Sequence, residues 1–336
     1  MAEPVQTKAP RESGVSATMG ASEFAGAPPR RRISAPVLSR VIRILHRHLW
    51  TGRLGKSLFN AAGLHVLPAN FYSTVPTVDE VLETFEEREE TPPYLDPAVF
   101  DDAAALAFLD ELLPYAAEFD PPVDDPGPSG GAQYHWNNSA FSYSDAIAYY
   151  TILRARKPRR VIEVGSGFST LVAAAALEAN GGGELICVEP HPRPFLRGHP
   201  AIAELVVSPV QALPASWFDE RLDDGDVFFI DSTHTVKIGS DCLHLYLRVL
   251  PALRRRVLVH AHDIFLPFGF PPEWALDHHY YWTEQYLLMA FLLGNSSWRY
   301  RFGSHHFLRC HPDRIAALMG GRYEAGGSSF WFERID

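Results

Sequence analysis

Aspartate and histidine residues stand at the ends of two apolar segments in the second half of the chain. FFIDSTH contains Asp231 and His234, and VLVHAHDI contains His262 and Asp263. Both apolar runs read as strands of a parallel sheet, whose carboxyl ends meet at one edge. Neighbouring strands lie about 4.8 Å apart, so we expect the two aspartates to be close. Such carboxylates repel each other unless a cation or a proton lies between them.

A glycine turn follows an earlier apolar segment, in VIEVGSGFST at residues 161–170. Its two glycines would let the backbone approach a ligand closely. A dinucleotide-binding loop would continue to a third glycine, where Thr170 stands, and would seat a pyrophosphate at a helix N-terminus. Glu189 ends the next segment, CVEP, about 20 residues on, where a carboxylate can accept ribose hydroxyls. Together, the glycine turn and Glu189 favour a site for a nucleotide-type ligand. The alternative is that the first is an ordinary tight turn and the second a solvated acid.

From Arg159 onward, short strand-like segments alternate with helical ones. The expected strands are RRVIEVG, ELICVEP, ELVVSPV, DVFFIDS and RRVLVHAHDI, and residues 237–250 read as a helix. This alternation predicts an α/β fold, a Rossmann-like doubly wound and mostly parallel sheet. At the end, SWRYRFG and SSFWFERI flank a short helix, which indicates an antiparallel last strand.

The first part of the chain differs from this pattern. Residues 1–33 are poor in large apolar side chains and are expected to form a disordered tail. Residues 34–130 are expected to form a helical region that ends in a proline-rich linker, and residues 131–336 the α/β domain. A helix capped by Ser34 carries arginines opposite its apolar face. Such a helix either packs on its own domain, which we favour, or lies on a membrane.

Composition narrows the function classes. The 336 residues carry a net charge of −10, so the chain as a whole lacks the positive charge that is typical of nucleic-acid-binding proteins. The three cysteines lie far apart without a CxxC motif, as is ordinary for a reduced cytoplasmic protein. No apolar run reaches the roughly 18 residues of a membrane span, and no apolar signal core is present. We therefore expect a cytoplasmic protein, and the sequence leaves its oligomeric state open.

Taken in order, EVGSG, CVEP, FIDSTH and HDI resemble the class I S-adenosylmethionine-dependent methyltransferases. The likeness is to bacterial small-molecule enzymes with D-S-x-H after the fourth strand and H-D-I after the fifth, and covers about residues 130–336. It implies S-adenosylmethionine as cofactor, whose single ribose and methionine tail need no pyrophosphate loop. The stretch QYHWNNSAFSYSDAIAYY is expected to cover the cofactor with Asn137, Asn138 and Asp145. The implied cofactor-binding residues are Glu163, Gly165, Ser166, Gly167, Ser169, Glu189, Asp231 and Asn138.

The resemblance also gives the strand-end residues a role. Methyl transfer is a displacement, so positioning dominates and a base adds roughly 10²–10⁴-fold. His234 is the candidate base, because a free imidazole titrates near pH 6.5 and is largely neutral in the cytoplasm. Similar enzymes bind Mg²⁺ through an acid after the fourth strand and an acidic pair after the fifth. Here the metal ligands would be Asp231, His262 and Asp263, a set that suits Zn²⁺, Mn²⁺ or Fe²⁺ better than Mg²⁺.

Other readings of these residues stay open. His234 could instead orient Asp231 or cap a loop, and the whole group could hold two strand ends together. The favoured function is O-methylation of a small molecule, such as a sugar or a secondary metabolite. The alternatives are N- or C-methylation, another reaction of this cofactor, or a cofactor-binding partner without catalysis. The loop FLPFGFPPEWALDHHYYWTEQYLLMAFLLG is expected to receive the acceptor. Its candidate substrate-facing residues are His278, His279, Tyr281, Trp282 and Glu284.

Overall fold

The computed structural model describes residues 35–49, 53–65, 69–87, 91–127 and 132–336. The chain divides into two compact units, with the boundary between Ser73 and Thr74. The predicted tail, residues 1–33, and the predicted cap Ser34 lie outside the described residues. In the part that is described, no helix has the length and apolar content to cross a bilayer.

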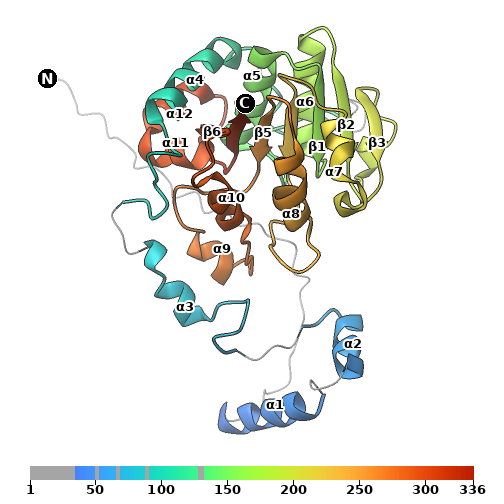
Figure 1. Ribbon diagram of the computed structural model, residues 1–336, viewed down its shortest axis with the longest axis vertical. Helices are drawn as coiled ribbons and strands as arrows, with labels where there is room; N and C mark the ends of the chain where they lie inside the picture. Colours follow the sequence, from blue (N-terminus) through green and yellow to red (C-terminus); the bar gives the residue numbers. More distant parts are fainter. Residues whose placement is uncertain (1–34, 50–52, 66–68, 88–90, 128–131) are drawn as a thin grey trace, which may run out of the picture. The chain divides into compact units, whose positions relative to one another are not determined.

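The first unit contains two helices, α1 (Ala35–Leu49) and α2 (Arg53–Ala61), drawn in blue in Figure 1. The helix expected from the apolar spacing is therefore present. Its apolar side chains Val37, Leu38, Val41 and Ile42 are each between 46% and 54% exposed. The described part of this unit thus provides no core for them, and the expectation that the helix packs on its own domain stays a prediction.

The second unit is built on a seven-stranded sheet with the order β3-β2-β1-β4-β5-β7-β6. Strands β1 (Arg160–Val164), β2 (Glu184–Val188), β3 (Ile202–Val206), β4 (Val227–Ile230) and β5 (Leu258–Ala261) are parallel. Strand β7 (Phe330–Arg334) runs antiparallel between β5 and β6 (Trp298–Gly303). The predicted Rossmann-like, mostly parallel sheet with an antiparallel last strand is confirmed.

Hydrogen bonds align the strand ends that carry the polar residues. The first residue after β1, Gly165, donates to Val188 O at 3.0 Å. Asp231 after β4 donates to Val164 O at 2.8 Å, and His262 after β5 donates to Ile230 O at 2.9 Å. Since each strand pairs one residue beyond its end, the loops that follow leave the sheet at one level.

Helices cover both faces of the sheet. Helices α4 (Asp102–Ala116), α5 (Tyr143–Arg156), α6 (Phe168–Ala179) and α12 (Pro312–Met319) pack against one another. The connection from β1 to β2 and the connection from β4 to β5 step in opposite directions along the sheet. Because such crossovers are right-handed, the helical segment between β4 and β5 lies on the other face from α6. It starts as α8 (Asp241–His244), which Ser240 caps, and continues as a π turn over Leu245–Val249. Helices α7 (Ala215–Asp219) and α10 (Glu284–Leu292) contact that turn.

The proline-rich segment at residues 121–131 does not divide the structure. Helix α4, which precedes it, buries Phe108, Leu109 and Leu112 and contacts α5 and α12. It therefore shares the core of the sheet unit, and the observed division lies about fifty residues earlier. The same unit contains α3 (Val78–Leu82), a 3₁₀ turn at Phe85–Glu87, α9 (Pro272–Leu276) and α11 (Ser304–Cys310).

Candidate functional site

The four polar residues predicted at the ends of β4 and β5 meet at one edge of the sheet. His234 Nε2 lies 3.2 Å from Asp231 Oδ1 and 3.4 Å from Asp263 Oδ2. His262 Nδ1 lies 3.5 Å from Asp231 Oδ1 and 3.6 Å from Asp263 Oδ1. Each imidazole therefore faces both aspartates. We call these four residues the rim cluster.

Two members of the rim cluster have unusual backbone conformations. His234 has φ +57° and Asp263 has φ +55°, in the left-handed region that residues with a side chain rarely adopt. Such residues cost of order 1–3 kcal/mol each and persist where the surroundings impose them, often at functional sites. The strain turns both side chains toward the same point.

Each histidine of the rim cluster has a buried carboxylate behind it. Glu284 accepts from His234 Nδ1 at 2.8 Å and from the Tyr246 hydroxyl at 2.8 Å. Asp145 lies 3.2 Å from His262 Nε2 and accepts from the backbone N–H groups of residues 328 and 329, both at 2.9 Å. Both carboxylates are almost fully buried. They fix the ring orientations, as outer carboxylates do for metal-binding histidines.

These contacts correct two sequence-based expectations. Glu284 was expected to face the substrate, but its side chain is 1% exposed and is engaged by His234 and Tyr246. Asp145 was expected to cover the cofactor, but its carboxylate supports His262 and the loop before β7. The sequence gave no signal for either pairing, because the partners lie 50 and 117 residues apart.

The charges of the rim cluster are strongly coupled. Burial alone would lower the pKa of His234, but hydrogen bonds to Asp231 and Glu284 and the charges of Glu284 and Asp263 outweigh it and raise the pKa to about 10. The pKa of His262 is also raised, since Asp263, Asp231 and Asp145 overcome its burial. This raised pKa favours the protonated form of His234, whereas the sequence led us to expect a neutral imidazole.

The rim cluster has donor atoms placed for a metal ion. Ligand atoms of Asp231, His262 and Asp263 lie within 4.8 Å of one another. His262 Nδ1 is buried and has no hydrogen-bond partner, although most buried polar atoms have one. The separations of 3.5 and 3.6 Å from His262 Nδ1 to the oxygens of Asp231 and Asp263 are close to the edge of a tetrahedron with metal–ligand bonds of about 2.0–2.1 Å. The residues therefore fit a divalent metal.

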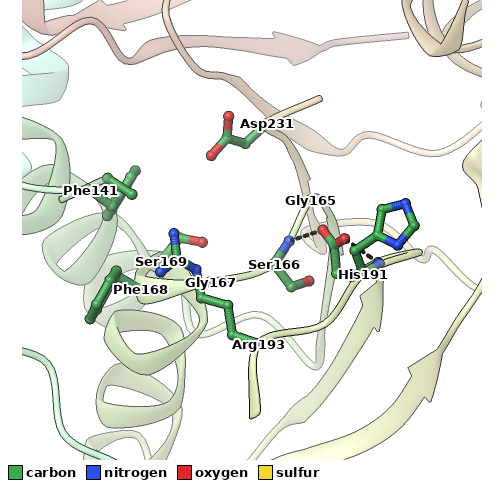
Figure 2. Close-up of a pocket in the computed structure, with 11 residues that line it drawn as sticks. Phe141, Gly165, Ser166, Gly167, Phe168, Ser169, His191, Arg193 and Asp231 are labelled. Carbon is green, nitrogen blue, oxygen red and sulfur yellow. Dashed lines mark hydrogen bonds between the residues drawn. The ribbon is translucent and has the colours of Figure 1, made fainter. Parts of the chain in front are cut away.

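A cavity next to the rim cluster lies over the glycine turn (Figure 2). Asp231 lines this cavity and also belongs to the rim cluster, so the two sites are contiguous. The predicted residues that line it are Gly165, Ser166, Gly167, Ser169, Glu189 and Asp231. Ala140, Phe141, Phe168, His191 and Arg193 line it as well, and sequence reasoning missed them. The nearest signal for two of them was HPRP, directly after the acid of the second strand.

Glu189 organises the floor of the cavity. Its carboxylate accepts from the backbone N–H of Ser166 at 3.2 Å and from that of His191 at 2.7 Å, the dashed lines in Figure 2. It thereby connects the loop after β1 with the loop after β2. Each carboxylate oxygen has further acceptor capacity for ligand hydroxyl groups.

Glu163 lies beneath the turn instead of in the cavity. It is fully buried in β1, where its carboxylate accepts from Thr170 Oγ1 at 2.5 Å and from the Tyr149 hydroxyl at 3.0 Å. Thr170 Oγ1 in turn accepts from the N–H of Gly167 at 3.0 Å. Burial raises the pKa of Glu163 to about 7, against the two hydrogen bonds, which lower it. The residue expected to hold the cofactor thus shapes the turn from below, and Thr170 is its link to the turn.

Asn138 also has a local role. Its amide donates to His135 O and Phe141 O, at 2.8 and 2.7 Å, and its oxygen accepts from Phe141 N at 2.7 Å. It does not line the cavity, whereas Ala140 and Phe141 of the loop that it holds do. The predicted covering segment is therefore present at the cavity, and its contact is apolar.

The loop after β5 places aromatic rings beside the rim cluster. The Trp282 ring packs on His234 with 4.5 Å between centroids and stacks on Tyr280 at 4.5 Å. A groove beside this loop is lined by Trp282, Tyr281 and His279. His278 is exposed and stacks on Tyr280. Of the predicted acceptor residues, Trp282 and the buried Glu284 contact His234, whereas His278, His279 and Tyr281 lie at the groove or at the surface.

Comparison with known proteins places the site in a family. A family model described as a methyltransferase domain matches residues 162–264, which run from β1 to just beyond β5 and include the turn, Glu189 and the rim cluster. An uncharacterized protein of Archaeoglobus fulgidus is 31% identical over 172 residues, which is 49% of this chain and 77% of that protein.

Two solved structures were also similar. An O-methyltransferase from Bacillus cereus in complex with SAH has a TM-score of 0.35 and 11% identity, over 68% of this chain and 91% of that one. The plantazolicin methyltransferase BamL, in complex with a triazolic desmethylPZN analog and SAH, has a TM-score of 0.34 and 12% identity, over 56% and 84%. TM-scores this low do not support a conclusion about the family or the function of this chain. On its sheet order, its strand-end motifs and the matched domain, the chain belongs to the class I S-adenosylmethionine-dependent methyltransferases.

Proposed function

We propose that this enzyme transfers the methyl group of S-adenosylmethionine to a hydroxyl oxygen of a small molecule, such as a sugar or a secondary metabolite, with the help of a divalent metal. The observation that carries the proposal is the contact between the cavity and the rim cluster, which share Asp231. A donor in the cavity and an acceptor at the rim cluster would meet there. The cytoplasmic location inferred from the sequence stays part of this proposal.

The chain's residues position the two reactants. The glycine turn and Glu189 hold the donor, and Asp231 fixes the cavity relative to the acceptor. A divalent metal bound by Asp231, His262 and Asp263 would act as a Lewis acid that lowers the pKa of an acceptor hydroxyl. His262 is held for this by Asp145, and Trp282 excludes water from the side of His234.

His234 is the proposed base. Its ability to accept a proton depends on the charges of Asp231 and Asp263 beside it. Two aspartates face its Nε2 atom and keep it protonated while their charges are uncompensated. With those charges offset, Nε2 becomes free to take the proton of the acceptor. Glu284 then stabilises the imidazolium that forms, because it holds Nδ1 at 2.8 Å.

Turnover with and without metal tests this function. We expect the purified enzyme to form S-adenosylhomocysteine with some hydroxylated small molecules, to lose this activity after chelation, and to regain it with Mn²⁺, Fe²⁺ or Zn²⁺ more than with Mg²⁺. Mass spectrometry of the native protein would identify the bound metal directly. Full activity in the presence of a strong chelator would contradict the metal-assisted part of the proposal.

Replacing Glu189 by alanine should weaken cofactor binding by about ten- to hundredfold. The change removes an acceptor for the cofactor ribose and releases the N–H groups of Ser166 and His191, and each lost hydrogen bond to a charged group is worth roughly 1.5–3 kcal/mol. Calorimetric titration with S-adenosylhomocysteine measures the effect. Glu204→Ala, an exposed acid on β3 outside the cavity, is the matched control and should bind as the parent does.

A further inference from the structure

We propose that the unit formed by α1 and α2 binds the surface of a membrane that contains anionic lipids, and that α1 lies in the plane of that surface. This inference is independent of the proposed acceptor and metal. It rests on the charge of the segment, on the two faces of α1 and on the exposure of its apolar side chains.

The charge of the chain is divided unevenly. Residues 24–78 contain eight of the 30 arginines and lysines and none of the 40 aspartates and glutamates. The rest of the chain therefore has 22 basic and 40 acidic residues, and is strongly negative. A segment with this charge is attracted to anionic lipid headgroups, at roughly 1 kcal/mol for each basic residue near the surface.

The two faces of α1 have different chemistry. At 100° per residue, Val37, Val41 and Ile44 lie along one line of the helix, and Leu38 and Ile42 lie beside them. Arg43 lies opposite the centre of this apolar face and Arg40 lies at its edge, and all of these side chains are exposed. Helix α2 adds exposed Arg53 and Leu58. An apolar face next to a basic face is the pattern of a helix that lies in the headgroup region.

This pattern favours a membrane over the other anionic partners. Nucleic acid would satisfy the arginines but leave the apolar face of α1 in water. A lipid interface accommodates both faces, because acyl chains receive the apolar side chains and headgroups receive the arginines. At 15 and 9 residues, the helices are shorter than the roughly 20 residues of a membrane span, so they would lie on the surface.

Sedimentation with vesicles tests the proposal on the full-length enzyme. We expect the protein to co-sediment with vesicles of phosphatidylglycerol and phosphatidylcholine in equal parts, and not with phosphatidylcholine alone. Binding should weaken as salt rises, because the attraction is screened. The proposal would be overturned by equal binding to both vesicle types. It would also be overturned if the protein bound duplex DNA but neither vesicle type.

Two variants separate the charged and apolar contributions. Arg40→Glu together with Arg43→Glu should weaken vesicle binding on the order of a hundredfold or more, because two attractive charges become repulsive. Val41→Asp should weaken it at unchanged basic charge. The matched control is Arg255→Glu with Arg299→Glu, two exposed arginines of the sheet unit, which should bind as the parent does. Melting temperature and cofactor affinity should be unchanged in all three. If the α1 variants bind vesicles like the control, the proposal is wrong.

Discussion

Replacing Gly165 by valine should remove measurable cofactor binding, with a loss of at least about a hundredfold in affinity. Gly165 has φ +82°, a conformation that costs a residue with a side chain roughly 1–2 kcal/mol. More important, a Cβ atom at this position would lie 1.7 Å from the carbonyl oxygen of Asp231, far inside contact distance. The clash forces β1 and β4 apart at the point where the turn and the rim cluster meet.

The matched control for this prediction is Gly181→Val. Gly181 has a similar φ of +86° in the turn after α6, but a Cβ atom there would have no neighbour within 4 Å. This variant therefore carries the backbone strain without the clash. Titration calorimetry with S-adenosylhomocysteine on both folded variants separates the two causes. Parent-like affinity of Gly165→Val would show that the turn does not hold the cofactor.

The mostly parallel sheet and the rim cluster could be predicted because the relevant signal is local. Each strand of a parallel sheet is a short apolar run, and the first polar residues after it lie at the carboxyl edge. Asp231, His262 and Asp263 could therefore be placed together from two short stretches of sequence, FFIDSTH and VLVHAHDI. The 3.5 Å between Asp231 and His262 and the 3.4 Å between His234 and Asp263 follow from the pairing of β4 with β5.

The role of Glu163 could not be read in this way. Strands that are buried on both faces show no alternation of polar and apolar residues, so the sequence does not say on which side of β1 a lone acid lies. The structure places it toward Tyr149 of α5 and Thr170 of α6, below the turn. Its position is set by helix packing, which the strand motif does not encode.

The supporting carboxylates Asp145 and Glu284 illustrate a second limit. Asp145 reaches His262 because α5 starts beside the loop that precedes β7, where Gly327 leaves room for the carboxylate. A Cβ atom on Gly327 would lie 2.3–2.5 Å from the carboxyl group of Asp145. Such a contact joins three distant segments, and no spacing rule within one segment predicts it. For the same reason the proline-rich stretch after α4 resembled a domain boundary although α4 packs into the shared core.

Replacing Asp263 by asparagine should lower turnover by roughly 10²–10⁴-fold while cofactor affinity stays near that of the parent. Asp263 does not line the cofactor cavity, so donor binding should not depend on it. Asparagine has the same shape and tolerates the left-handed backbone at φ +55°, so the change removes mainly the charge. The bond from the Ser328 hydroxyl, 2.8 Å in the parent, can be kept by the amide oxygen.

The same variant distinguishes a catalytic rim cluster from a structural one. If the acids and histidines only hold two strand ends together, Asp263→Asn should lower the melting temperature along with the rate. If they hold a metal and orient the acceptor, the variant should lose bound metal, measured by mass spectrometry of the native protein, at little cost in stability. Asp120→Asn, at an exposed acid far along the chain from the site, is the control for the loss of one charge. A metal-loaded and fully active Asp263→Asn enzyme would exclude Asp263 from the reaction.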